Sequence, residues 1–362
     1  MAAEMKSTWV PDVPVPPGDT IREMLEARGI PQSDFALRLG KSEKFVSQLI
    51  NGKATLSHET ALELEKVLGV SSAFWNNAEA TYRDLLARQR TKEAAPDQTE
   101  WVASFPLKEM ERHGWIAREA NPAEQAEELL SYFGVSTVQA YRDYWGSEKR
   151  LAARMSTAYT PETSAVAAWL RAGERMAEEI RTEPFSESGF RIALGVLRGA
   201  TRLTPDEWIA LMRKECAHAG VAVVLVPDLP KTRCHAVSWW TSRTRAVIQL
   251  GLRYKTDDQV WFSFFHEAGH ILLDERGRSG ISDLDRGPHI ETRANRFATD
   301  YLIPPAEYDV FVAAGRPSKA DVRAFAKRIG ISPSIVAGRL RHDGVIPRTW
   351  MHDLHVRLDW DR

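Results

Sequence analysis

The chain has 362 residues, of which 43% are hydrophobic and 27% are charged. This length allows two or three domains with separate cores, and the composition is that of an ordinary globular protein. Because 48 Lys and Arg residues almost balance 49 Asp and Glu residues, a uniformly basic nucleic-acid-binding protein is excluded. The two cysteines are too few for a disulfide framework. We find no apolar run long enough to cross a bilayer and no signal-peptide core, so we expect a cytoplasmic protein without membrane contact.

Periodicity and turn residues predict four parts: an N-terminal arm over residues 1–17, a helical domain over 18–90, a helical connector over 91–185 and a C-terminal domain over 186–362. The predicted fold class is mainly α with a small β-sheet, that is, α+β. The polar stretch 88–98 indicates a linker.

Within the C-terminal part, two short β-branched runs at 221–226 and 245–250 predict paired strands. An apolar helix follows, then a polar loop from about 275 to 287. Helical periodicity resumes over 290–303 and again over 318–343, where we expect a pair of helices.

The first helices have the spacing of a helix-turn-helix. The capping pattern Thr20-Ile21-Arg22-Glu23 predicts a helix that begins at Thr20 and ends near Gly29. A second helix is predicted over 32–39 and a third over 43–50. Gly40 lies in the turn between them, where a left-handed backbone is often required. The third helix would enter the DNA major groove.

Apolar Val46 and Leu49 lie on the inward face of the third helix, which leaves its polar residues pointing outward. Gln and Asn side chains can bond base edges, and Lys or Ser side chains can hold phosphate. The alternative is a small helical bundle with a solvated polar face. We predict DNA contacts from Gln32, Ser42, Lys44, Ser47, Gln48, Asn51 and Lys53.

The segment from residue 15 to about 90 resembles the XRE family of regulators, through Asn51-Gly52-Lys53-Ala54 and the run 61–70. The run Ala73-Phe74-Trp75-Asn76-Asn77 is similar to HigA-type antitoxins. This resemblance implies a five-helix, lambda-repressor-like bundle that binds double-stranded operator DNA. A homodimer is expected from the paired half-sites that such domains recognise.

The most informative motif is His266-Glu267-Ala268-Gly269-His270, within a nearly continuous apolar run. Histidines four residues apart lie on one helix face, so both imidazoles can reach one zinc ion. Glu267 is then placed as the general base that accepts a proton from water at the ion. The motif can also arise by chance on an amphipathic helix, but buried histidines beside a buried glutamate need partners.

A catalytic zinc site needs a third protein ligand. The metzincin continuation is excluded because Leu273 and Arg276 occupy its Gly and His positions. Glu291 is preferred because it shares the inward face of a later helix. Asp274, one turn beyond His270, and Asn295, one turn beyond Glu291, are better placed to orient the histidines. The remaining candidates for the third ligand are Glu275, Asp283, Asp285 and His289.

Residues 205–347 resemble the ImmA/IrrE family of zinc metallopeptidases. The likeness is carried by the motif at 266–270, by Glu291-Thr292-Arg293-Ala294-Asn295-Arg296-Phe297-Ala298, by Leu302-Ile303-Pro304 and by the tail 326–340. It implies a zincin-like domain in which His266, His270 and Glu291 bind Zn²⁺ and Glu267 is catalytic. The middle of the chain resembles the connector of fusions between the two families.

These resemblances predict a DNA-binding regulator whose peptidase cuts a regulatory protein, either itself or a partner repressor. The alternative is a HigA-like antitoxin whose C-terminal part binds a toxin, with zinc serving a structural role. A third option is a sensor in which a ligand at the zinc changes DNA affinity. Tyr301, His235 and Arg293 are candidate donors to the oxyanion.

Overall fold

The computed structural model describes residues 14–93, 96–145, 163–232, 234–251, 256–274 and 288–358. The chain divides into two compact units, residues 1–98 and 99–362. Each unit has its own hydrophobic core, and each is described separately below.

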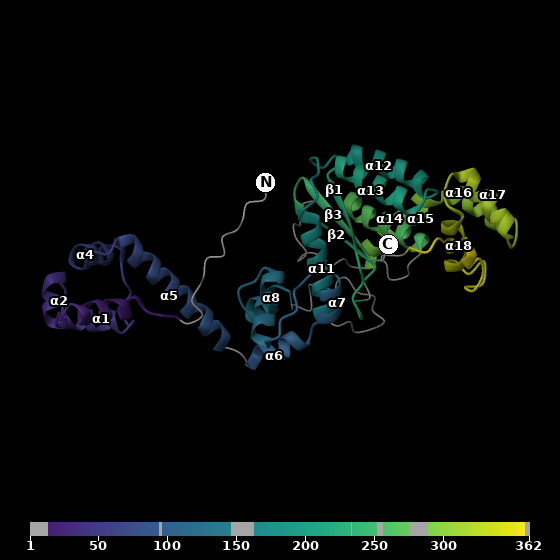
Figure 1. Ribbon diagram of the computed structural model, residues 1–362. Helices are drawn as coiled ribbons and strands as arrows, with labels where there is room; N and C mark the ends of the chain where they lie inside the picture. Colours follow the sequence, from purple (N-terminus) through teal and green to yellow (C-terminus); the bar gives the residue numbers. More distant parts are fainter. Residues whose placement is uncertain are drawn as a thin grey trace. The chain divides into compact units, whose positions relative to one another are not determined.

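The first unit is the predicted bundle of five helices (Figure 1): α1 Pro17–Ala27, α2 Gln32–Leu39, α3 Glu43–Ile50, α4 His58–Leu68 and α5 Ser72–Glu93. Ser42 caps α3 by accepting a hydrogen bond from the backbone N–H of Phe45. The turn before it requires a left-handed residue, and Gly40 supplies one with a φ of 68°. Val46 and Leu49 are buried as predicted, so α3 turns its apolar face into the core.

Two predicted boundaries in this unit are wrong. Helix α1 begins at Pro17 and not at Thr20, so Thr20 lies inside the helix. A proline fits the first helical position because its missing N–H would have no intrahelical partner there. Helix α5 continues to Glu93 and therefore covers half of the stretch that was predicted to be a linker.

The second unit is built on a three-stranded sheet of β1 (Val221–Val226), β2 (Ala236–Ser242) and β3 (Arg245–Gly251). The strand order is β1-β3-β2; β3 pairs in parallel with β1 and antiparallel with β2. Strands β1 and β3 confirm the sequence prediction. Strand β2 was not predicted, although it is the strand that lies beside the candidate site.

Both faces of the sheet are buried, which explains the continuous apolar sequence of β1. Val221, Val223 and Leu225 face the core that contains α12 (Glu187–Ala200), α13 (Pro205–His218) and α14 (Asp257–Leu273). The alternate residues Ala222, Val224 and Val226 face a second core, which includes α11 (Thr163–Glu178). Helices thus cover the sheet on both sides (Figure 1).

The second core is completed by four helices that precede α11 in the chain: α6 Pro96–Ala103, α7 Leu107–Arg112, α8 Pro122–Phe133 and α9 Val138–Tyr144. The predicted boundary between a connector at 91–185 and a domain at 186–362 therefore does not separate two compact units. A sheet with two apolar faces needs a helical layer on each, and the segment expected to connect domains supplies one of those layers.

After α14 come α15 (Pro288–Leu302), α16 (Pro305–Ala313), α17 (Lys319–Ile329), α18 (Pro333–His342) and a short 3₁₀ turn at His352–Leu354. Helices α15, α17 and α18 confirm the prediction, whereas α16 was not expected. Within the described ranges, no helix combines the length and apolarity needed to span a membrane.

Arg198 on α12 connects the C-terminal ends of two of these helices. Its Nε donates to the carbonyls of Tyr301 (2.9 Å) and Leu302 (3.1 Å), and its Nη1 donates to that of Ile329 (2.9 Å). These carbonyls lie in the last turns of α15 and α17, where the helix itself provides no N–H group to bond them. Burial of the guanidinium lowers the pKa of Arg198.

We expect Arg198→Met to lower the free energy of unfolding by about 2–3 kcal/mol, because it removes a charged donor from three carbonyls. The matched control is Arg191→Met on the same helix, where an exposed ion pair with Glu187 is lost. That change should cost less than about 1 kcal/mol. Urea denaturation of both variants tests the comparison, and equal losses would show that Arg198 does not hold the helix ends.

Candidate metal centre and DNA-binding face

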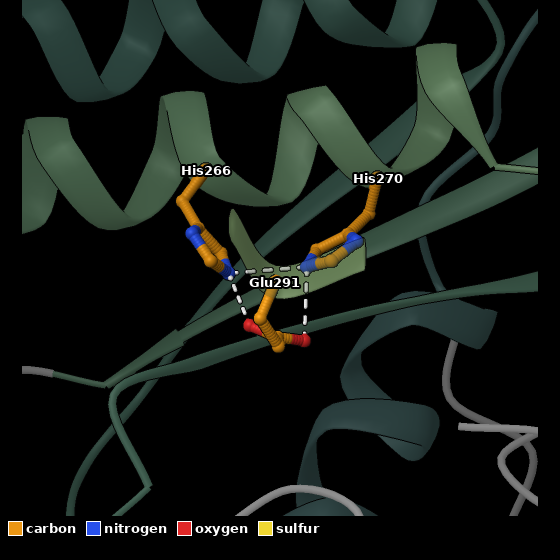
Figure 2. A group of neighbouring side chains, drawn as sticks. All are labelled: His266, His270 and Glu291. Carbon is orange, nitrogen blue, oxygen red and sulfur yellow. Dashed lines mark hydrogen bonds and ion pairs between the residues drawn. The ribbon is translucent and has the colours of Figure 1, made fainter. Parts of the chain in front are cut away.

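Helix α14 carries both histidines of the motif. Its first turn contains Asp257 and Asp258, which suit the positive end of a helix dipole. The helix is anchored in the core by Trp261, Phe264 and Phe265, whose side chains are fully buried. The opposite face is thereby fixed, and it presents His266 and His270 one turn apart with their imidazoles toward one point (Figure 2).

Helix α15 brings Glu291 to that point. The two helices pack closely at Gly269, where a Cβ atom would lie 3.1 Å from Phe297 and 3.3 Å from the backbone of Ala294. Glu291 Oε2 lies 3.2 Å from His266 Nε2, and Glu291 Oε1 lies 3.4 Å from His270 Nε2 (Figure 2). The two Nε2 atoms are 3.1 Å apart.

The second nitrogen of each ring contacts an oxygen acceptor. His266 Nδ1 lies 3.0 Å from Oδ1 of Asn295, and His270 Nδ1 lies 2.8 Å from Oδ2 of Asp274. A neutral imidazole that donates from Nδ1 has its lone pair on Nε2. The Nε2 lone pairs of His266 and His270 and the carboxylate of Glu291 therefore face one another. A divalent cation would stabilise this arrangement, and two histidines with one carboxylate are common zinc ligands.

The carboxyl group of Glu291 responds to the same surroundings. Burial raises its pKa, but the hydrogen-bonding and electrostatic influence of the facing side chains of His266 and His270 outweighs this effect. The pKa of Glu291 therefore lies well below its ordinary value. The carboxylate is ionised at neutral pH, as a zinc ligand must be.

Glu267 is only 4% exposed and lies on the side of α14 that faces the sheet. Ser238, in the unpredicted strand β2, donates a hydrogen bond of 2.7 Å to Oε2 of Glu267. Sequence reasoning missed this contact because Ser238 is 29 residues away and its strand had not been recognised. The alternation of residues over 236–240 was the available signal, since it places Ser238 on the opposite face from Val237 and Trp239.

The structure describes only some of the other sequence candidates. Glu275, Asp283 and Asp285 lie outside the described residues, and His289 is exposed. The proposed oxyanion donors Arg293 and Tyr301 have other partners: Arg293 donates to the carbonyl of Leu273, and the hydroxyl of Tyr301 lies 3.4 Å from the carbonyl of Arg191.

A second acidic group, Asp257, Asp258 and His355, lies at the start of α14. Asp258 lies 3.4 Å from Arg341 and 3.0 Å from His355. Asp257 accepts hydrogen bonds from Ser334 and from the backbone N–H of Val356. Burial raises the pKa of Asp258, but His355 and Arg341 together lower it below its ordinary value. This cluster already contains a cation and fastens the C-terminal segment to the first turn of the metal-binding helix.

The predicted DNA-contacting residues lie on the surface of the first unit. All seven are exposed, namely Gln32 on α2, Ser42 at the cap, Lys44, Ser47 and Gln48 on α3, and Asn51 and Lys53 after it. Asn51 has an additional role, because its amide donates to the carbonyl of Ser47 (2.7 Å) and closes α3. Lys41, which flanks this face, pairs with Glu63 at 2.9 Å.

Comparison with known proteins agrees with this division of the chain. Residues 21–75 match a family described as helix-turn-helix, and residues 216–341 match the IrrE N-terminal-like domain of the M78 peptidases. The chain is 36% identical over 61 residues to the uncharacterized HTH-type transcriptional regulator YddM of Escherichia coli strain K12. That match covers 17% of this chain and 65% of the relative's own length.

Two solved structures are also similar to part of the chain. One is a putative antidote protein of a plasmid maintenance system from Nostoc punctiforme, 31% identical, covering 22% of this chain and 89% of that chain with a TM-score of 0.22. The other is an addiction module antidote protein of a HigA family from Coxiella burnetii, 23% identical, covering 24% and 94% with a TM-score of 0.21.

Proposed function

We propose that this chain, which joins an N-terminal helix-turn-helix domain to a C-terminal IrrE N-terminal-like domain, is a transcriptional regulator that carries a zinc-dependent endopeptidase. One observation carries the peptidase half. Ligand atoms of His266, His270 and Glu291 all lie within 4.8 Å of one another, and Glu267, which follows His266 on α14, is buried. Three protein ligands and an adjacent carboxylate are the components of a catalytic zinc site.

The three ligands would hold zinc, which when bound supplies a Lewis acid that acidifies water and polarises a peptide carbonyl. Asn295 and Asp274 contact the Nδ1 atoms of the two rings, whose Nε2 atoms lie toward the carboxylate of Glu291. Because each ring is fixed through its other nitrogen, little side-chain entropy is lost when the metal binds.

Glu267 performs the proton transfers. Its carboxylate accepts a proton from the attacking water and returns it to the nitrogen that leaves. The hydrogen bond from Ser238 orients this carboxylate. Because Glu267 is buried, bulk water does not compete with the substrate for the proton that this carboxylate carries.

The substrate we propose is a regulatory protein, either a partner repressor or this chain itself. A DNA-binding domain in the same chain would confine cleavage to proteins that meet it at an operator. The exposed polar face of α3 supports operator binding, and paired half-sites would require a homodimer.

Purified protein should contain about one zinc per chain and lose it to a chelator, as elemental analysis would measure; a chain that never retains zinc would refute the metal site.

Replacing Gln48 with alanine tests the DNA-binding half. Gln48 is exposed on α3, and loss of a bidentate contact to adenine should weaken specific binding by about 1–3 kcal/mol, or roughly 5- to 150-fold. The measurement is a mobility shift on DNA from upstream of its own gene, with unrelated DNA as competitor. The matched control is Asn77→Ala, which removes an exposed amide from α5. Equal affinities for both variants and the unaltered chain would exclude this face as the reader of sequence.

A further inference from the structure

A cavity of about 300 Å³ lies in the second unit beside the candidate metal centre. Its walls come from α14, α15 and α18, together with Ile303, which follows α15. The apolar side chains in the wall are Phe262, Leu302, Ile303 and Ile335, and polar residues such as Asp258, Gln259, Thr299 and His342 also line it. Asn295, the residue that bonds His266, also lines the cavity. The volume is at the lower end of the range for small-ligand pockets.

The position of the cavity connects it to the metal centre. Phe262 lies one helical turn before His266 on the same face of α14, and their ring centroids are 6.3 Å apart. Thr299 lies one turn beyond Asn295 on α15. The cavity therefore begins next to a metal ligand and extends along the groove between the two helices, away from Glu267, which faces β2.

The chemistry of the walls selects an apolar occupant. Leu302, Ile303 and Ile335 are at most 5% exposed, and Phe262 adds an aromatic wall. The hydroxyl of Thr299 bonds to carbonyls of its own helix and is not directed to a ligand. The two charged lining residues Arg339 and Asp258 are already paired, Arg339 with Asp343 at 2.6 Å and Asp258 with His355 at 3.0 Å.

We propose that this cavity is the specificity pocket of the peptidase and receives an apolar side chain, of leucine to phenylalanine size, next to the scissile bond. The proposal rests on the proposed function, because it requires a peptide held at the metal centre. Cleavage would therefore select sites by one large apolar residue, and proteins whose candidate sites carry charged residues at that position would be spared.

The test is isothermal titration of the zinc-loaded full chain with three hydroxamates, which share one zinc-binding group. Acetohydroxamate has no side chain, isocaproyl hydroxamate carries a leucine-like chain, and succinate monohydroxamate carries a charged chain of similar reach. Since each buried methylene contributes a factor of roughly four, the isocaproyl compound should bind at least about tenfold more tightly than acetohydroxamate. The succinate compound should gain nothing.

A filled pocket should remove this preference. Thr299→Phe puts a phenyl ring into the cavity, and we expect it to reduce the tenfold preference to less than about twofold while acetohydroxamate still binds. The matched control Arg296→Phe puts the same ring on the exposed side of α15 and should keep the preference. Equal binding of all three hydroxamates to the unaltered chain would overturn the pocket alone. Failure of every hydroxamate to bind a zinc-loaded chain would overturn the proposed function together with it.

Discussion

Glu267→Gln should reduce peptide cleavage by about 100- to 10,000-fold while zinc content stays unchanged. This range is the usual contribution of a positioned general base. A glutamine side chain has almost the same shape as the native one, and its amide oxygen could still accept the hydrogen bond from Ser238. The fold and the three metal ligands should therefore be preserved. The measurement is co-expression with proteins from neighbouring genes, followed by mass spectrometry of cleavage products.

Two controls make that result interpretable. Zinc per chain and thermal stability should be the same for Glu267→Gln and for the unaltered protein. If both forms process every neighbouring regulator identically, the peptidase proposal fails and the antitoxin interpretation gains support. In that case a small toxin should co-purify with the chain, and zinc removal should not affect DNA binding.

His270→Ala should weaken zinc binding by more than about 100-fold, because it removes a ligand that is 2% exposed. Removing a group that only orients a ligand typically costs about 10- to 100-fold. The matched variant is therefore Asn295→Ala, which leaves all three ligands in place but releases the ring of His266. Competition with a chelator of known affinity would rank the two variants.

The dependence of folding stability on zinc concentration tests the same prediction independently. At a free zinc concentration about 100 times its dissociation constant, the native chain should gain about 2.7 kcal/mol of stability, and His270→Ala should gain almost none at that concentration. Equal zinc affinity in His270→Ala and the native chain would place the metal elsewhere, and Asp257, Asp258 and His355 would then be the first group to test.

Local patterns predicted much of the fold. The helix-turn-helix could be placed because capping, turn glycines and inward apolar residues all depend on near neighbours. Thr20 illustrates the limit of such reasoning: it belongs to a plausible capping box, yet Pro17 begins the helix earlier because its ring already has a helical φ. Strand β2 was missed because its stability comes from pairing with β3 and from helices on both faces, which no short window contains.

For the candidate site, the spacing of four residues was enough to pair His266 with His270, because it is close to one helical turn. The apolar face of a separate helix favoured Glu291. The packing of the domain brings Glu291 to both rings, because the approach of α15 to α14 depends on Gly269 and its contacts. It also decided the partner of Glu267 and the cavity beside the ligands. Those features join β2, α14, α15 and α18, and the distances between such segments are set by packing of the whole domain.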